Sequence, residues 1–180
     1  MKTKIYLGFI LGVIAFLIYE SLNKSTNDPK SKRLDCLKQV TSFEKLYEKE
    51  LKKDAINALL DGNYTKKSKI EYSKLIKSKL VNIISVDDFD KLVEDILKSK
   101  IKSDKNPSEN SLLIDYYIYE NDKADSNKKN KDALLYAGYI VFEFFYSDKK
   151  VYKVQIDYLN DDASDLEKRV QCAIDSFLSL

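Results

Sequence analysis

The chain has 180 residues, of which 44% are hydrophobic and 33% are charged, and its 31 basic and 29 acidic side chains leave a formal net charge of +2. This near balance gives no electrostatic reason to expect nucleic acid as a partner. The sequence has no histidine, which excludes Ser-His-Asp and Cys-His catalysis and nearly all catalytic zinc sites, and it has no phosphate-binding glycine motif. We therefore predict neither a nucleic-acid partner nor a metal or small-molecule cofactor.

An apolar run at the N-terminus predicts a membrane anchor. Residues 5–19 carry no charge, and continuing this run to Leu22 gives a helix of about 27 Å, close to the roughly 30 Å of a bilayer core. We expect residues 1–22 to be a transmembrane anchor that contacts the lipid bilayer from Ile5 to Leu22. Lys2 and Lys4 place the N-terminus in the cytoplasm by the positive-inside rule, and the rest of the chain in the periplasm or outside the cell.

A cleaved secretory signal is the alternative interpretation of the same run, and it would make the protein secreted. Such a site needs small residues at an A-x-A-like spacing, and neither Ser21 nor Ser25 has a small partner there, so we favour the uncleaved anchor. A membrane helix leading into an α+β head resembles type IV pilins and pseudopilins in outline. Their glutamate five residues into the mature chain is absent, because Val13 is the fifth residue after Gly8. We therefore do not assign that family.

The rest of the chain has the size of one domain. Residues 23–31 form a polar linker, and residues 32–180 are enough to build a single α+β domain with its own core. Cys36 and Cys172 are the only cysteines, and in an oxidising compartment such a pair predicts a disulfide between the first and the last helix of the domain. The alternative is two buried free thiols that pack as small hydrophobic groups.

Three helices are predicted in the first half of this domain. Apolar residues recur at three- to four-residue steps in residues 32–60, and the same period appears in residues 65–84, where lysines lie between the apolar positions as solvated residues do. Ser85 begins the clearest helix, because its hydroxyl can cap the N-terminus and an apolar stripe runs from Phe89 to Ile101. We interpret the acidic residues that follow Ser85 as the solvated start of this helix rather than a metal site.

The second half is predicted to form a sheet followed by a helix. Residues 112–120, 133–146 and 151–159 are dense in the residues that favour strands, and the polar segments 121–132 and 147–150 are predicted to connect them. In the third strand one face is apolar and should be core; its residues are Tyr152, Val154, Ile156 and Tyr158. Asp162 or Ser164 should cap the last helix.

The predicted class is therefore α+β, with an N-terminal membrane helix, then a helical half, a three-stranded antiparallel meander and a C-terminal helix packed on the sheet. If one face of the sheet is core, the other face brings tyrosines beside charged residues, a composition that protein interfaces favour. An additional helix covering this second face is the alternative. The candidates for binding a partner are Tyr117, Tyr119, Tyr139, Phe145 and Lys153.

Two classes of function follow from these features. The first is a membrane-tethered extracytoplasmic protein-interaction domain without catalytic activity, such as an immunity protein or an accessory subunit of an envelope complex, with a protein partner. The second is an envelope hydrolase that uses paired carboxylates on a carbohydrate or peptide. The carboxylates considered for the hydrolase are Asp157, Asp161, Asp162 and Asp165 near one end of the sheet, and Asp115 with Glu143. Asp161, Asp162 and Asp165 are better explained as residues of a helix start, so we favour the first class.

Overall fold

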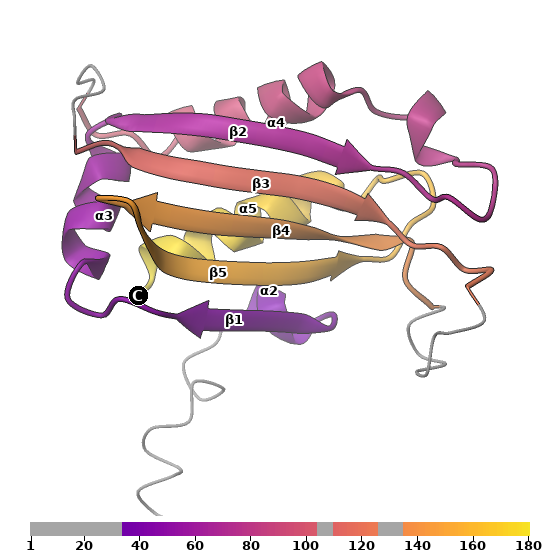
Figure 1. Ribbon diagram of the computed structural model, residues 1–180, viewed down its shortest axis with the longest axis horizontal. Coiled ribbons are helices and arrows are strands. Elements are labelled where there is room, and N and C mark those ends of the chain that lie inside the picture. The colour runs from indigo at the N-terminus through magenta and orange to yellow at the C-terminus, as the bar shows by residue number, and fades with distance from the viewer. Residues whose placement is uncertain (1–33, 104–109, 126–134) are drawn as a thin grey trace, which may run out of the picture. The chain divides into compact units, whose positions relative to one another are not determined.

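A five-stranded mixed β-sheet forms the centre of the unit Asp35–Leu180 (Figure 1). The computed structural model describes residues 34–103, 110–125 and 135–180. The strands lie in the order β1-β5-β4-β3-β2, and all neighbouring pairs are antiparallel except β2 and β3, which are parallel. Their bounds are β1 (Ser42–Leu46), β2 (Tyr64–Glu71), β3 (Leu112–Glu120), β4 (Gly138–Tyr146) and β5 (Lys149–Tyr158).

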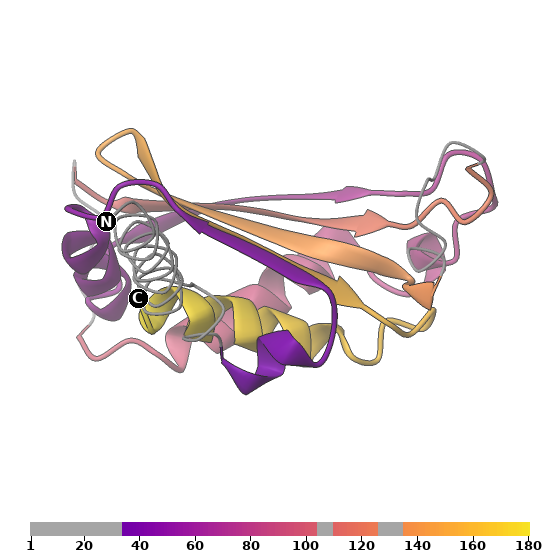
Figure 2. The same ribbon diagram turned by 90° about the horizontal axis from the view of Figure 1, so that it is seen from below.

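The described helices are α2 (Asp35–Lys38), α3 (Lys52–Leu60), α4 (Val86–Lys98) and α5 (Leu166–Leu178), and the 3-10 turn η2 (Leu80–Asn82) precedes α4. Helices α2, α4 and α5 lie on one face of the sheet (Figure 2). Helix α3 lies at one end of the sheet (Figure 1). The described helices therefore leave the second face of the sheet uncovered.

Aromatic side chains dominate the packing between the sheet and these helices. Phe144 of β4 stacks on Phe177 of α5 with ring centroids 3.9 Å apart, and Tyr116 of β3 stacks on Phe142 of β4 at 5.1 Å. Phe89 of α4 meets the Tyr116 ring edge-on at 5.5 Å. All five side chains are fully buried, and burying each one stabilises the fold by roughly 1.5–3 kcal/mol. This cluster therefore holds both α4 and α5 on the sheet.

The beginning of β4 requires a glycine. A Cβ atom on Gly138 would collide with the backbone carbonyl of Tyr119 on β3 and with the side chain of Tyr158 on β5. The Tyr119 carbonyl and the Tyr158 side chain therefore occupy the space that a side chain at this position would need.

The helices predicted over residues 32–60 and 65–84 are wrong. The first region contains the short helix α2, the edge strand β1 and then helix α3, and the second begins with strand β2, which pairs in parallel with β3. Lysine, leucine and glutamate favour helices locally, but pairing with β5 and β3 overrides that preference. The sheet consequently has five strands of mixed direction rather than the three of an antiparallel meander, so the predicted helical half and meander are both corrected.

The predictions for the elements after residue 85 fit the structure more closely. Helix α4 begins with a capping box, in which the Ser85 hydroxyl accepts from the Asp88 backbone N–H at 3.1 Å and the Asp88 carboxylate accepts from the Ser85 backbone N–H at 3.3 Å. The predicted strand 112–120 coincides with β3, and the predicted core face of β5 is buried. The tight turn between β4 and β5 is shorter than predicted, with Ser147 and Asp148 at positive φ as a two-residue hairpin requires.

No helix in the described ranges 34–103, 110–125 and 135–180 is long and apolar enough to cross a membrane. The membrane helix that formed part of the predicted fold therefore has no counterpart among these residues. The anchor predicted over residues 1–22 and the linker predicted over residues 23–31 both lie outside the described residues.

Cys36 and Cys172 form a disulfide with an S–S distance of 2.03 Å. The bond joins α2, at the start of the described chain, to α5, at its end, across a sequence separation of 136 residues. Cys172 is a buried residue of α5. The disulfide therefore ties the short helix α2 to the core that α5 forms with the sheet.

Candidate functional site

The face of the sheet that the described helices leave uncovered carries the residues predicted to bind a partner, and we name it the open face. Tyr119 of β3 lies directly opposite Tyr139 of β4, and the two rings stack with centroids 4.7 Å apart. Tyr117 meets the Tyr139 ring edge-on at 6.4 Å. The three predicted tyrosines therefore form one aromatic cluster, because residues two apart on a strand point to the same face.

The other two predicted residues lie on the same face beside this cluster. Glu143 of β4 forms ion pairs of 2.8 Å with both Lys150 and Lys153 of β5. The Lys150 ammonium also lies 5.2 Å from the centre of the Phe145 ring, a cation–π contact. Phe145 and Lys153 are thereby linked through Glu143 and Lys150, at the end of β4 away from the tyrosine cluster.

Several residues of the open face were missed by the sequence analysis because their strands were predicted as helices. Phe43 and Tyr47 extend from β1 and are 63% and 42% exposed. On the opposite edge, Lys69 of β2 lies 4.7 Å from the centre of the Tyr117 ring and pairs with Glu71. The two strands, SFEKL and YTKKSKIE, show no clear apolar alternation, so the sequence carried no local signal for them.

Burial and hydrogen bonds shift the pKa values of the titratable side chains on this face. It raises the pKa of Tyr139 to about 12 and also raises the pKa values of Tyr117 and Tyr119, so all three remain neutral phenols that can donate hydrogen bonds. Burial also raises the pKa of Asp157 to about 6. It acts in the same direction on Glu143, but hydrogen bonds from Lys150 and Lys153 outweigh it and lower the pKa of that carboxyl. The face thus combines neutral hydroxyls with internally paired charges.

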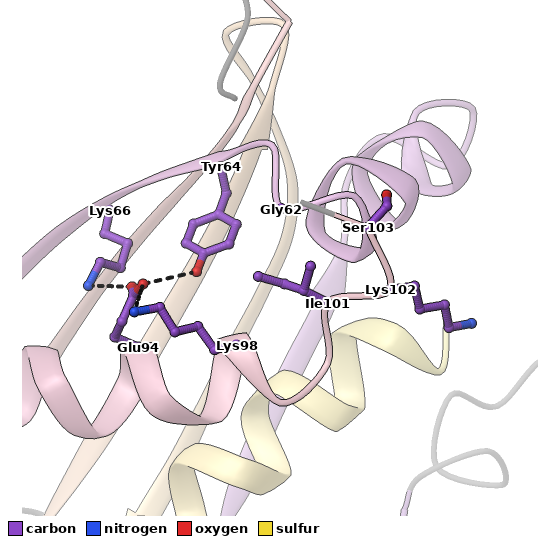
Figure 3. Close-up of a pocket in the computed structure, with 8 residues that line it drawn as sticks. All are labelled: Gly62, Tyr64, Lys66, Glu94, Lys98, Ile101, Lys102 and Ser103. Atoms are coloured by element: carbon purple, nitrogen blue, oxygen red, sulfur yellow. Dashed lines mark hydrogen bonds and ion pairs between the residues drawn. The ribbon is translucent and has the colours of Figure 1, made fainter. Parts of the chain in front are cut away.

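A second candidate is a hollow of about 590 Å³ between β2 and α4 (Figure 3). Glu94 lies at its centre and accepts three contacts, from Lys66 at 2.7 Å, from the Tyr64 hydroxyl at 3.4 Å and from Lys98 at 3.4 Å. Lys66 also pairs with Asp90 at 2.9 Å. Burial disfavours the charged form of Lys66, but the carboxylates of Glu94 and Asp90 outweigh this effect and raise the pKa of Lys66. Two of the lysines that line the hollow are therefore already bound to protein carboxylates.

Two acidic residues of α4 bind a lysine of β2. Asp90 and Glu94 bind Lys66, rather than being solvated as predicted, and Asp88 caps the helix. Among residues 34–103, 110–125 and 135–180, no group of three histidine, cysteine, aspartate or glutamate side chains is arranged to hold a metal ion. This acidic region serves instead to attach α4 to β2.

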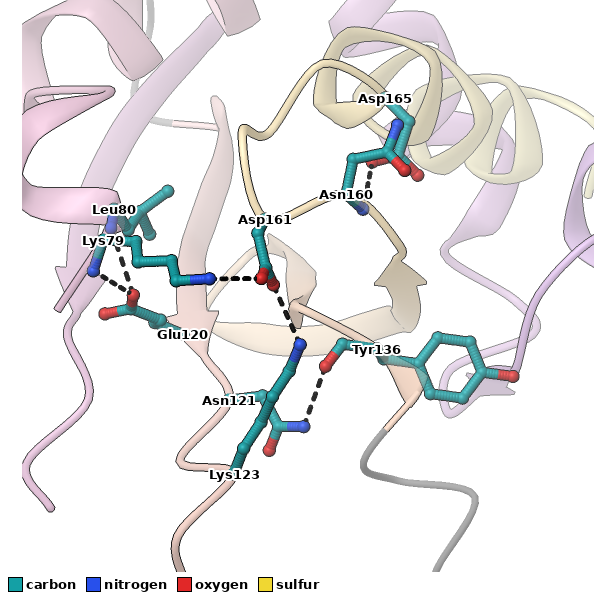
Figure 4. Close-up of polar contacts among 9 residues, drawn as sticks. All are labelled: Lys79, Leu80, Glu120, Asn121, Lys123, Tyr136, Asn160, Asp161 and Asp165. Carbon is teal, nitrogen blue, oxygen red and sulfur yellow. Dashed lines mark hydrogen bonds and ion pairs between the residues drawn. The ribbon is translucent and has the colours of Figure 1, made fainter. Parts of the chain in front are cut away.

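Two buried carboxylates at the end of β3 hold the connection between β2 and α4. Glu120 accepts from the backbone N–H groups of Ser73 at 2.9 Å, Lys79 at 2.8 Å and Leu80 at 3.1 Å (Figure 4 shows the last two). Asp122 accepts from those of Lys74 at 3.0 Å and Leu75 at 2.7 Å. We name Glu120 and Asp122 the carboxylate clamp. The prediction of residues 121–132 as an exposed loop was therefore wrong at its start, where Asn121 and Asp122 are buried.

The carboxylates near the end of β5 also hold loops. Asp161 accepts from Lys79 at 2.6 Å and from Lys123 at 2.9 Å (Figure 4). Asp165 accepts from the backbone N–H groups of Leu159 at 3.0 Å and Asn160 at 3.2 Å, so it fixes the turn before α5. Glu120 and Asp161 both line a cavity of about 50 Å³, which is the space of one or two water molecules and far below that of a sugar ring.

The last three candidate carboxylates, Asp115, Glu143 and Asp157, lie on the open face. Asp115 and Glu143 are opposite each other, but Asp115 lies 3.8 Å from Lys67 and Glu143 is paired with two lysines. Asp157 is four residues along β5 from Lys153, the partner of Glu143, which is about 13 Å at about 3.3 Å per residue. Glycosidase carboxyl pairs lie about 5–9.5 Å apart, so Asp157 and Glu143 do not fit that chemistry.

Comparisons with known proteins assign no family. No protein-family model and no curated protein sequence matches the chain. Among solved structures, the chain is similar to a PelC dodecamer from Paraburkholderia phytofirmans, with 11% sequence identity and a TM-score of 0.38, covering 77% of this chain and 94% of that one. A likeness at this level supports no conclusion about function.

Proposed function

We propose that this protein is a membrane-tethered, extracytoplasmic protein-interaction domain without catalytic activity, such as an immunity protein or an accessory subunit of an envelope complex. The observation that carries the proposal is the cluster of Tyr117, Tyr119 and Tyr139 on a sheet face that no described helix covers. The tether and the compartment rest on the apolar run of residues 1–22 and belong to the proposal.

The arrangement of the tyrosines supports protein binding. Their rings already stack on one another, so little side-chain freedom remains to be lost when a partner packs on them. Each ring offers a large apolar area and a hydroxyl, the combination that is enriched at the centres of protein interfaces. Paired charges lie beside the rings, as Lys69 with Glu71 on one side and Lys153 with Glu143 on the other, which resembles a polar rim.

The hydrolase alternative lacks comparable support. Most of the carboxylates considered for it hold loops or pair with lysines. Asp157, whose pKa burial raises, lies about 13 Å along β5 from Lys153, the partner of Glu143. We therefore do not propose a hydrolase.

Site-specific photocrosslinking in intact cells that naturally produce the protein tests this proposal. Benzoylphenylalanine in place of Tyr119 should crosslink one protein, whereas the same group in place of Lys168, an exposed residue of α5 on the helical side, should not. Tyr139→Ser in the crosslinking background should abolish the product. The matched control Tyr136→Ser removes a tyrosine outside the aromatic cluster and should preserve it. Equal crosslinking from positions 119 and 168, or none from position 119, would refute binding through the open face.

A further inference from the structure

The connection between β2 and α4, residues 72–85, exposes aliphatic side chains to an unusual degree, and we name it the β2–α4 loop. Leu75 is 63% and Val81 is 53% exposed, and Ile76 and Ile83 are also exposed. Residues 73–84 include lysines but no acidic, aromatic or arginine side chain. The loop therefore combines exposed aliphatic groups with positive charge.

The lysines are placed around the most exposed aliphatic pair. Lys74 and Lys77 flank Leu75 and Ile76 in the sequence, and neither ammonium group forms an ion pair with any residue in the described ranges. Lys79 differs, because Asp161 binds it at 2.6 Å. Two solvated cations therefore stand on either side of two adjacent aliphatic side chains.

The loop is held in shape by the carboxylate clamp. Asp122 fixes the backbone of Lys74 and Leu75, and Glu120 fixes that of Ser73 and Lys79, so the exposed segment is tied down on both sides of its tip. A contact surface that is ordered before binding loses less conformational entropy when a partner arrives. Leu75 and Ile76 are thus exposed from a segment whose backbone the carboxylate clamp holds on both sides.

Other exposed aliphatic residues lie at the same end of the sheet. Strands β2, β3 and β5 all end there and β4 begins there (Figure 1). Leu135, just before β4, is 70% exposed, and Leu159, just after β5, is 41% exposed. Ile76 also lines the small cavity next to Tyr158 and Asp161, which places the loop tip near the end of β5.

We propose that the β2–α4 loop is a contact site for an anionic lipid surface, with Leu75 and Ile76 entering the boundary between headgroups and acyl chains. Lys74 and Lys77 would bind lipid phosphates while their methylene stems follow the apolar pair. A protein partner fits less well, because the centres of protein interfaces are rich in aromatic residues and arginine and poor in lysine. The open face has the aromatic composition that residues 73–84 of the β2–α4 loop lack, so the two surfaces suit different partners.

Depth-dependent fluorescence on the full-length chain tests this proposal. The chain is incorporated into vesicles of phosphatidylcholine alone or mixed with phosphatidylglycerol, with the native disulfide oxidised and an NBD fluorophore on Leu75→Cys. In the anionic vesicles the emission should shift to the blue, and lipids with a nitroxide on the acyl chain should quench it several-fold more than in phosphatidylcholine. The same label on Lys168→Cys, an exposed position of α5, should respond to neither change.

Neutralising the two flanking charges separates lipid recognition from simple proximity to the bilayer. Lys74→Gln with Lys77→Gln in the labelled chain should remove most of the extra quenching, and near-ultraviolet circular dichroism checks that the double variant folds. An aqueous spectrum at position 75 in both vesicles, or equal quenching in both, overturns the proposal without needing the variant. A blue shift that appears only when a crosslinked protein partner is present overturns it as well and assigns the loop to protein binding. Neither result bears on the open face, whose test uses position 119.

Discussion

The carboxylate clamp allows a sharp prediction for the substitution Glu120→Gln. The two carboxylate oxygens of Glu120 accept hydrogen bonds from different donors. Oε1 accepts from the backbone N–H groups of Lys79 and Leu80, and Oε2 accepts from the backbone N–H of Ser73. A glutamine keeps one oxygen but replaces the other with an NH₂ group, which must then face a backbone N–H. With Glu120 only 7% exposed, water does not readily replace the lost acceptor.

The size of the effect follows from the bonds that are lost. A hydrogen bond to a charged group contributes about 1.5–3 kcal/mol, and leaving a buried donor unsatisfied costs about 1–3 kcal/mol. We therefore expect Glu120→Gln to lower the free energy of unfolding by about 2–3 kcal/mol. At about 2–4 °C per kcal/mol for a domain of this size, the melting temperature should fall by about 5–10 °C.

Asp122→Asn provides the matched comparison. Asp122 accepts from both Lys74 and Leu75 through the same oxygen, Oδ2. An asparagine can keep its carbonyl oxygen at that place, so the bonds from the backbone N–H groups of Lys74 and Leu75 persist. We expect a loss of less than about 1 kcal/mol, clearly smaller than that for Glu120→Gln.

The effect of Glu120→Gln should also depend on pH. Burial raises the pKa of Glu120, but hydrogen bonds from Ser78 and from the backbone of Ser73, Leu80 and Lys79 outweigh it and hold the pKa below the ordinary value of 4.5. The stabilisation by this carboxylate is therefore fully present above pH 4.5 and is lost as the pH falls through the lowered pKa. The difference between the native chain and the variant should therefore shrink as the pH falls below 4.5 and through this lowered pKa.

Urea unfolding followed by circular dichroism, with the disulfide oxidised, measures these free energies near pH 7 and below about pH 4. Hydrogen exchange at the amides of Ser73, Lys79 and Leu80 locates the effect, since these three should lose protection in the Glu120→Gln variant. Equal unfolding midpoints for the two variants, with unchanged protection at these amides, would refute the reasoning.

Two further predictions concern the disulfide and the open face. Replacing Cys36 and Cys172 together with serine should lower the unfolding free energy by up to about 5 kcal/mol, because the bond closes a loop with a sequence separation of 136; an unchanged urea midpoint would contradict this. Asp157→Asn should stabilise the protein above pH 6 and have little effect near pH 4, because burial raises the pKa of Asp157 to about 6, so the stability of the native chain falls as the pH rises through this window. Allowing for solvent screening, we expect the stabilisation by Asp157→Asn, measured in thermal melts, to grow by about 1–2 kcal/mol between pH 4 and a pH above 6. The same effect of the substitution at both pH values would contradict this prediction.

The sequence predicted well those elements whose local pattern agrees with their place in the fold. The apolar stripe and capping residues of α4 act within one helix, and the strand-forming composition of β3 and β5 is strong enough to specify strands without knowledge of their neighbours. The cluster of Tyr117, Tyr119 and Tyr139 was foreseeable for the same reason, since alternation along strands joined in an antiparallel order brings these positions to one face.

Strands β1 and β2 were not foreseeable in this way. The segment Tyr64–Glu71 contains three lysines and a glutamate, which suit a helix, and it becomes a strand because β3 offers a parallel partner and α4 offers carboxylates to Lys66. The pairing of β1 with β5 likewise joins residues more than a hundred positions apart. Such long-range pairing leaves no trace in a local period.

Some features of the candidate surfaces likewise follow from composition and residue spacing, and others depend on tertiary contacts. Composition alone excludes imidazole catalysis and provides the two cysteines and the tyrosine-rich strands, because these depend only on which residues are present and on their spacing. The mixed five-stranded sheet, the buried carboxylate clamp and the exposed β2–α4 loop depend on contacts between distant segments, such as Glu120 with residues of the preceding loop. Hydrogen bonds across such separations are satisfied only in the folded chain, so the folded chain alone reveals which carboxylates are buried and which aliphatic residues face solvent.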